Sequence, residues 1–231
     1  MHSELADVII TYATKPHKEL SGLLLDKSKD QLISLLTTLL TIYINDRNSS
    51  TIREYITVSL AGYTHIDKKI GYNGFKQSTT IGGKSLYCEA KPQNINTENN
   101  KSIKHPRKLN GGGNFTDYTY NRLQKDISEN PNMLVSGFVN GELIYILEFP
   151  FNYPTFTENL KKQLKKRFPK GDKTSEFLRS ANFNYEDYRN CPSFKVIYLS
   201  KGKLERTKDN FNRKFYDFLE HIKWSHLIKL F

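Results

Sequence analysis

Apolar residues at helical spacing dominate the N-terminal part of the chain. The clearest segment begins at Ser28, where Gln31 three residues later completes the pattern of a capping box. The apolar residues that follow recur three and four apart, as one face of a helix requires. They are Leu32, Leu35, Leu36, Leu39, Leu40 and Tyr43. This spacing predicts a buried structural helix that ends near Asn45.

Local signals predict a second helix after this one. Thr51 and Glu54 offer another capping box, and Gly62 is a typical helix stop. Residues 1–27 are moderately apolar and are interrupted by a glycine, so we expect short helical pieces there.

Beyond residue 62 the hydrophobic pattern changes to that of strands. Lys69–Gln77 and Lys84–Lys91 are predicted to form a hairpin, because the segment between them contains Gly82-Gly83. Pro92 is expected to end the second strand, since proline cannot donate a hydrogen bond to a β-ladder.

The strongest hairpin signal lies further along the chain. Leu134–Val139 and Glu142–Phe149 are strand-like segments joined by Asn140-Gly141, the sequence typical of a type I′ turn. Ser193–Ser200 alternates in the same way and predicts another strand.

The remaining segments are predicted as a loop and three helices. Residues 93–113 are rich in Asn, Lys and Gly without periodicity and predict a long loop. A helix is expected from Asn114 or Thr116 to about Glu129. A basic helix is expected from Thr157. A last helix, with phenylalanines on one side, is expected from about residue 208.

Strands bracketed by helices predict an α/β (α+β) fold with a mixed central β-sheet flanked by helices. A length of 231 residues suits a single domain. We expect a helical part over about 1–62, a sheet core over about 63–150 and a helix–strand–helix part over about 151–231.

The formal net charge of +11 predicts an anionic partner, with nucleic acid ahead of a membrane. Only two cysteines occur, Cys88 and Cys191, and neither lies in a metal-binding motif, which argues for a reducing compartment such as the cytoplasm and against structural zinc. No signal peptide is recognisable. The longest apolar tracts are far shorter than the roughly 20 residues that span a membrane.

Candidate chemistry lies on the predicted strand Lys84–Lys91. Side chains alternate along a strand, so Glu89 and Lys91 share the face opposite Cys88 and Ala90. A carboxylate is a ligand for a hard divalent cation, and an ammonium group can orient a water or offset charge on a phosphate. The alternative reading is a surface ion pair.

A metal site that acts on a phosphodiester needs a second carboxylate near the first. Asp67 precedes the first strand of the hairpin, and Asn73 lies within it. Both can approach Glu89 across the hairpin, but only Asp67 is an acid.

The chain resembles the PD-(D/E)XK nucleases, typified by type II restriction endonucleases, in the order of its elements. An acid precedes a hairpin, Glu89-Ala90-Lys91 lies on the second strand of that hairpin, and a helix and further strands follow. The resemblance covers roughly Glu54 to Phe149. It implies a restriction-endonuclease-like sheet core, Mg²⁺-dependent cleavage of double-stranded DNA at a specific sequence, and often a homodimer.

The resemblance also implies residue roles. Glu89 and Lys91 match the acid and lysine of the E-x-K half-motif, Asp67 the upstream acid that holds Mg²⁺ together with Glu89, and Glu54 an accessory acid. The spacing favours position 73 for the upstream acid, where this chain has asparagine. Three explanations stay open: Asp67 acts over a longer connection, an amide is the ligand, or Asn73 is an inactivating substitution.

DNA contacts are expected from basic and polar residues around the catalytic strand and in the segment 101–122, where Tyr118 and Arg122 would share a helix face. The predicted DNA-binding residues are Lys76, Gln77, Gln93, Asn94, Lys104, Arg107, Lys108, Asn114, Tyr118 and Arg122. Two alternatives are a non-catalytic DNA-binding protein and a repair-type nuclease without sequence preference. Gly111-Gly112-Gly113 before the expected helix could present amides to a phosphate or be a flexible loop.

Overall fold

The computed structural model describes residues 3–45, 50–66, 71–78, 83–172 and 175–222, and its mixed α/β architecture confirms the predicted fold class. The α-helices in these residues are α1 (Ser3–Thr14), α2 (His17–Leu25), α3 (Lys29–Asn45), α4 (Thr51–Leu60), α5 (Thr97–Lys101), α6 (Tyr120–Glu129), α7 (Pro154–Arg167), α8 (Lys201–Arg206) and α9 (Arg213–Glu220). The strands are β1 (Thr64–His65), β2 (Gly74–Lys76), β3 (Leu86–Ile95), β4 (Gly113–Tyr118), β5 (Asn132–Val139), β6 (Glu142–Pro150), β7 (Leu178–Phe183) and β8 (Lys195–Leu199).

The described strands form a six-stranded mixed sheet in the order β1-β2-β3-β5-β6-β8 and a separate two-stranded ribbon of β4 and β7. Neighbouring strands of the sheet are antiparallel except for β3 and β5, which run parallel. The chain crosses from β3 to β5 through α5, β4 and α6, as a parallel connection requires.

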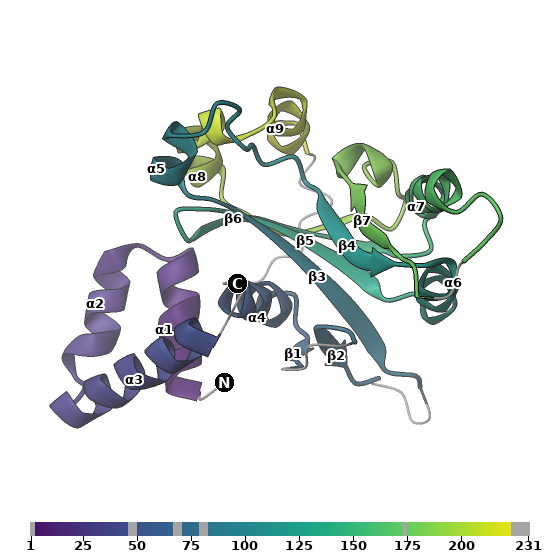
Figure 1. The fold of residues 1–231 in the computed structure, drawn as a ribbon. Helices are drawn as coiled ribbons and strands as arrows, with labels where there is room; N and C mark the ends of the chain where they lie inside the picture. The colour runs from purple at the N-terminus through teal and green to yellow at the C-terminus, as the bar shows by residue number, and fades with distance from the viewer. Residues whose placement is uncertain (1–2, 46–49, 67–70, 79–82, 173–174, 223–231) are drawn as a thin grey trace.

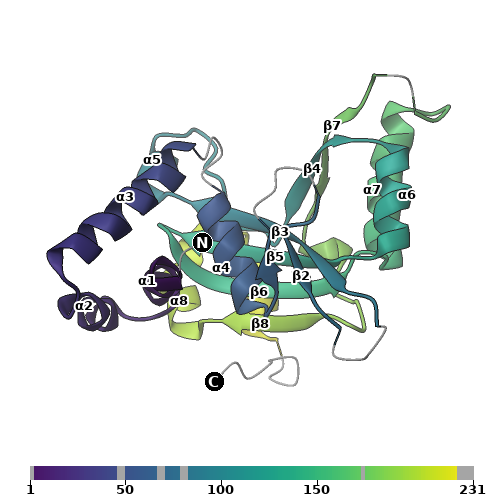
Figure 2. The ribbon, with the colours of Figure 1, turned by 90° about the horizontal axis from the view of Figure 1, so that it is seen from below.

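Helices cover both faces of this sheet (Figure 1). On one face α1 and α4 pack against the strands through residues such as Ile9, Ile56 and Val58. On the other face lie α6, α7, α9 and the ribbon of β4 and β7. Seen from below, α4 crosses the strands, with α1–α3 to one side and α6 and α7 to the other (Figure 2).

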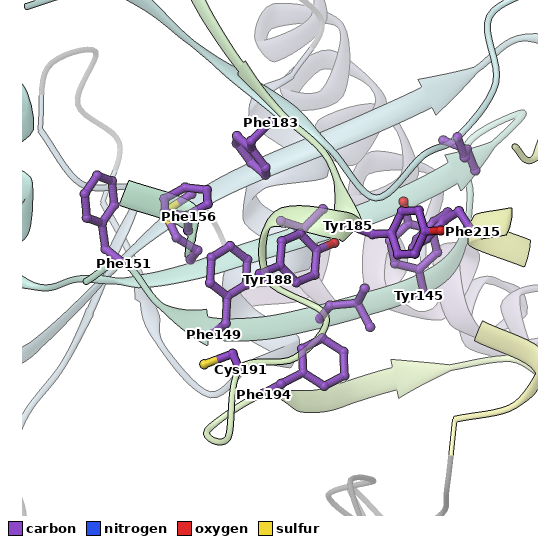
Figure 3. Packing of buried hydrophobic residues seen from close by; sticks show 14 of the residues in the cluster. Tyr145, Phe149, Phe151, Phe156, Phe183, Tyr185, Tyr188, Cys191, Phe194 and Phe215 are labelled. Atoms are coloured by element: carbon purple, nitrogen blue, oxygen red, sulfur yellow. The ribbon is translucent and has the colours of Figure 1, made fainter. Parts of the chain in front are cut away.

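The larger core cluster is aromatic and fills the face that carries the ribbon (Figure 3). Phe149 of β6 stacks on Tyr188 with ring centroids 4.2 Å apart, and Phe156 of α7 meets Phe149 edge-on at 5.0 Å. Such pairs stabilise beyond the area they bury. This packing joins α7 and the ribbon to the middle of the sheet.

The hairpin of β5 and β6 is confirmed, including its turn. Asn140 and Gly141 both have positive φ, 51° and 84°, as a type I′ turn requires. Almost every residue of these strands is buried, because helices cover both faces. The predicted strand over Ser193–Ser200 is also present, as β8.

The N-terminal helices are present, but α3 is not buried. The predicted capping box exists: Ser28 N donates to Gln31 Oε1 and Gln31 N to Ser28 Oγ. Among the described side chains of α3, Leu35, Leu39 and Ile42 pack against a core cluster. Five further apolar side chains of α3 are exposed, because the helix lies at the periphery beside α1 and α2 (Figure 1). They are Leu32, Ile33, Leu36, Leu40 and Tyr43, 39–64% exposed.

Helix α4 ends as predicted, since Gly62 has a φ of 76°. Its predicted capping box is wrong. Ser50, not Thr51, is the N-cap residue, and its side chain makes no capping hydrogen bond. Glu54 instead accepts a hydrogen bond from Asn73, which belongs to the segment before β2.

Strand β3 does not end at Pro92 but continues to Ile95. The reason lies in the neighbouring strand, because β2 pairs with Leu86–Cys88 and, in the described residues, does not extend along the rest of β3. Ala90 N points to that side, where it donates to an Asn73 side chain, and Pro92, two residues on, faces the same way. No ladder hydrogen bond is lost there, so proline fits.

The predicted loop and helix over 93–129 are partly wrong. Residues 93–95 extend β3, 97–101 form α5, and 113–118 form β4 rather than the start of a helix. Helix α6 begins at Tyr120, and Thr119 caps it by accepting a hydrogen bond from Arg122 N. Strand β4 is held by its pairing with β7, a strand that the sequence did not reveal.

At the C-terminal end, α7 begins at Pro154, three residues before the prediction, and α9 begins at Arg213, five residues after residue 208. Of the predicted strand Lys69–Gln77, only β2 is described as strand. No helix in the described residues is both long and apolar enough to cross a membrane.

Candidate active site

Glu89 and Lys91 lie together on β3, as strand alternation predicted. Lys91 Nζ is 2.6 Å from Glu89 Oε1. The pair is not on the surface, because the Glu89 side chain is 8% exposed and that of Lys91 20%. Glu89 Oε2 is buried and has no hydrogen-bond partner among the described residues. A buried carboxylate oxygen without a partner is costly, so it points to a missing cationic or donor group.

The Lys91 side chain is confined by β4, which crosses β3 at this point. Its Nζ lies 4.7 Å from the centroid of the Phe115 ring. A Cβ on Gly113 would come within 2.8 Å of Lys91 Cβ. Gly113 therefore permits the two backbones to approach.

The triglycine segment leads into β4 and not into a helix, so the reading in which a helix N-terminus presents its amides to a phosphate is wrong. Gly111 and Gly112 are buried, and their polar groups are used inside the protein. Tyr188 Oη donates to Gly111 O at 2.6 Å, and Gly112 N donates to Asn110 Oδ1.

Asn73 lies opposite Glu89. Gly74 pairs with Cys88, and one further step along this antiparallel register places Asn73 across from Glu89. Its side chain bridges two elements: Oδ1 accepts from Ala90 N at 2.8 Å, and Nδ2 donates to Glu54 Oε2 at 3.1 Å. The two partners, one donor and one acceptor, suit an amide and not a carboxylate.

Of the predicted acids besides Glu89, Glu54 lies beside Asn73 through this hydrogen bond, at the edge of β3. Asp67 lies outside the described residues. No group of three or more His, Cys, Asp or Glu side chains that could hold a metal ion occurs in the described ranges, which do not include Asp67.

Helix α6 contributes a buried acid that sequence reasoning missed. Asp126 is 3% exposed, accepts a hydrogen bond from Tyr118 Oη at 3.1 Å, and lies 3.4 Å from Arg122 Nε. Burial raises the pKa of the Asp126 carboxyl; Arg122 and Tyr118 oppose that rise, and the Glu89 carboxylate adds to it. The signal was present, since Asp126 follows Leu123 by three residues and so shares its inward face.

Tyr118 does not lie on the exposed helix face expected for it. It lies on β4 rather than on a helix, is fully buried, and donates to Asp126. Burial raises the pKa of its phenol, and the nearby Asp126 carboxylate raises it further. Its contribution is to fix the position of that acid.

Three predicted base-reading side chains are held by other protein groups. Gln93 Nε2 donates to Asn110 Oδ1, and Gln93 Oε1 accepts from Asn110 N. Asn94 Oδ1 accepts from Gly141 N at 3.4 Å. Asn114 Nδ2 donates to Ser180 Oγ.

Four of the five predicted cationic contacts are exposed, whereas Arg122 is half-buried beside Asp126. Asn100 holds the loop after α5, because its side chain donates to Arg107 O and accepts from Arg107 N. That loop presents three cations to solvent: Lys104, Arg107 and Lys108. Lys76 and Gln77 are also exposed.

Comparison with models of known protein families gave no match, and neither did comparison with curated proteins. The function is therefore inferred from the residues and their geometry.

Proposed function

We propose that this protein is a Mg²⁺-dependent endonuclease that cleaves double-stranded DNA at a specific sequence, as a type II restriction enzyme does. The observation that carries the proposal is the buried Glu89–Lys91 pair with one carboxylate oxygen left without a partner. Structural ion pairs normally satisfy both oxygens, whereas a cation-binding carboxylate keeps one for its ligand.

The arrangement around this pair supports the same reading. Glu89-Ala90-Lys91 stands on the second strand of the β2–β3 hairpin, followed by α6 and by β5 parallel to β3. This is the order of elements that the resemblance to the PD-(D/E)XK nucleases implies. The net charge of +11 favours a polyanionic substrate.

Each residue has a defined task in the proposed reaction. Glu89 Oε2 offers a hard oxygen ligand to the cation. A bound Mg²⁺ would withdraw negative charge from the scissile phosphate and acidify the attacking water. Lys91, held by Glu89 Oε1 and by the Phe115 ring, directs its ammonium group to the same place, where it orients that water and offsets charge on the phosphate.

Recognition would come from exposed cations of the chain. Lys104, Arg107 and Lys108 sit on a loop that Asn100 holds in one shape, so they are suited to phosphate or base-edge contacts. Each good bidentate base contact contributes about 1–3 kcal/mol of discrimination.

We further propose that the enzyme acts as a homodimer in the cytoplasm of a microbial cell. Two copies related by symmetry would address both strands of a duplex. The exposed apolar side chains of α3 are suited to contact between copies. Sedimentation of the full chain measures this: a mass near twice 26.9 kDa is expected, and a monomer at micromolar concentration would contradict it.

A non-catalytic DNA-binding protein is the second candidate, and Asn73 favours it. The amide stands where the register places the upstream acid, and both of its ends are engaged. Under this reading Glu89 and Lys91 are a structural pair.

Digestion of a mixed-sequence plasmid separates these functions. The full chain is incubated with Mg²⁺, and with EDTA as the matched control. A discrete band pattern that requires Mg²⁺ is expected. A smear would point to a repair-type nuclease, and an uncut but shifted plasmid would point to the non-catalytic protein.

A further inference from the structure

The proposed cation needs a second carboxylate. The residue opposite Glu89 is Asn73, which is not an acid and whose amide oxygen and nitrogen are both hydrogen-bonded within the protein. We infer that Asp126 of α6 is this second carboxylate and that it forms the divalent-cation site together with Glu89. The inference rests on the proposed function only for the use of the cation, since cation binding is measured separately.

Glu89 and Asp126 lie on the same side of the sheet. Glu89 pairs with Met133 on β5, and paired residues of neighbouring strands point to the same face. Met133 and Leu123 of α6 belong to the same core cluster. Asp126 follows Leu123 by three residues and faces inward with it.

A continuous series of contacts joins the two acids. Lys91, bound to Glu89, lies over the Phe115 ring, and the rings of Phe115 and Tyr118 are 5.0 Å apart. Tyr118 Oη then donates to Asp126.

Each acid also keeps an oxygen for a ligand. Glu89 is 6% exposed, with Oε2 unpartnered, and Asp126 is 3% exposed. Both side-chain contacts of Asp126 fall on Oδ2, which leaves Oδ1 without a side-chain partner in the described part of the chain. Two buried carboxylates, each with one oxygen engaged and one open, form a donor set that suits Mg²⁺ or Mn²⁺.

The competing explanation is that Asp126 only holds Tyr118 and Arg122 in place. Asp126→Asn separates the two, because the amide oxygen still accepts the hydrogen bond from Tyr118 Oη while the anionic ligand is lost. Tyr118→Phe is the reciprocal variant, since it removes the hydrogen bond and keeps the carboxylate.

The test is Mn²⁺ binding to the full chain without DNA, measured by calorimetry. Glu89→Gln and Asp126→Asn are each expected to weaken Mn²⁺ binding at least about tenfold. Residues that only support a metal ligand typically cost about tenfold or more when they are replaced, so the loss of a ligand itself should cost at least as much. Glu98→Gln is the control for loss of one negative charge, because Glu98 is exposed on α5, where it pairs with Lys101. This control is expected to bind Mn²⁺ within about threefold of the unmodified chain. Tyr118→Phe loses a hydrogen bond that positions Asp126 but keeps the carboxylate, so it is expected to weaken Mn²⁺ binding less than Asp126→Asn does.

Two results would overturn the inference: unchanged Mn²⁺ affinity in Asp126→Asn when Glu89→Gln is weakened, or no Mn²⁺ binding by the unmodified chain. Circular dichroism checks folding. Should Asp126→Asn not fold, Asp126→Glu, which keeps the charge but displaces the oxygens, takes its place with the same expected loss.

Plasmid cleavage by the same samples distinguishes this inference from the proposed function. Cation binding that depends on Asp126, in a chain that does not cut DNA, would leave the site standing and refute the endonuclease. Cleavage and Mn²⁺ binding that both survive Asp126→Asn would refute the site and leave the endonuclease standing.

Discussion

At the scale of single residues, the site is defined by which polar atoms are engaged and which are left open. Glu89 Oε2 lacks a partner among the described residues, although it is buried. Asn73, directly across the hairpin, has both ends of its amide engaged. A nuclease would have acids at both positions. Here position 89 has a carboxylate oxygen open to a ligand, whereas the amide at position 73 has none.

Asn73→Asp tests this account of Asn73. The substitution replaces a donor with a second carboxylate beside Glu54, so it loses one hydrogen bond and gains a like-charge contact. The free energy of unfolding in EDTA is expected to fall by about 1–3 kcal/mol, measured by urea unfolding. Plasmid cleavage is expected not to increase.

The matched control is Asn114→Asp, because Asn114 is exposed and its side chain bonds to Ser180. Unchanged stability of Asn73→Asp in EDTA would contradict the bridging role of the amide. A rise in cleavage would instead show that position 73 is the place of a missing acid.

The sequence predicts part of this site because strand alternation is a local rule. It places Glu89 beside Lys91 and brings Asn73 near them through a hairpin. Asp126 was missed because its burial depends on how α6 packs. Tyr118 was misplaced because 113–118 is a strand only through its pairing with β7, which lies about 60 residues further along the chain.

At the scale of elements, some are determined by local sequence signals and others by tertiary packing. The β5–β6 turn and the Ser28 capping box were readable because a few adjacent residues determine each. The ribbon of β4 and β7 was not, since its residues are polar and alternate poorly, and aromatic contacts such as Phe115 with Phe183 fix it. The same holds for α3, whose apolar pattern does not reveal that the helix lies at the edge.

Gly137 offers a test of element packing. A Cβ at this position would lie 2.1 Å from Tyr145 Cε1, and Tyr145 is fully buried against Phe215. Gly137→Ala is therefore expected to lower the free energy of unfolding by about 1–3 kcal/mol, the usual cost of overpacking.

Gly22→Ala is the matched control. Gly22 lies within α2, and no atom lies within 4 Å of the position that an alanine methyl group would take there. Alanine should therefore raise the free energy of unfolding by about 0.5–1 kcal/mol through helix propensity. Both values come from urea unfolding. Equal effects of the two substitutions would contradict the packing described for the β5–β6 pair.

At the scale of the whole molecule, the surface has a cationic part and an apolar part. The net charge of +11 includes the exposed cations Lys104, Arg107 and Lys108, while the N-terminal helices present the apolar side chains of α3. We assign the first surface to DNA and the second to another copy of the chain. The basic composition was informative about a partner class, but only the structure separates exposed cations from engaged polar groups such as Gln93.

Salt dependence measures the first assignment. Alanine at Lys104, Arg107 and Lys108 is expected to weaken binding to duplex DNA and to reduce the slope of log K against log salt by about 2–3, since each phosphate contact contributes about 0.9. Alanine at Lys15, Lys18 and Lys29 on the N-terminal side removes the same charge and should change the slope by less than about 1. Equal changes for both triple variants would contradict a local DNA-binding surface.

The central claim, that the Glu89–Lys91 pair hydrolyses DNA with a divalent cation, is tested most directly by Glu89→Gln. Single-turnover cleavage of duplex DNA in saturating Mg²⁺ is compared with that of the unmodified chain, and duplex binding is measured on the same samples in Ca²⁺. The account predicts that cleavage falls at least about 100-fold, the scale on which one electrostatic group at a reacting centre acts, while binding is retained. Cleavage at the unmodified rate would contradict it.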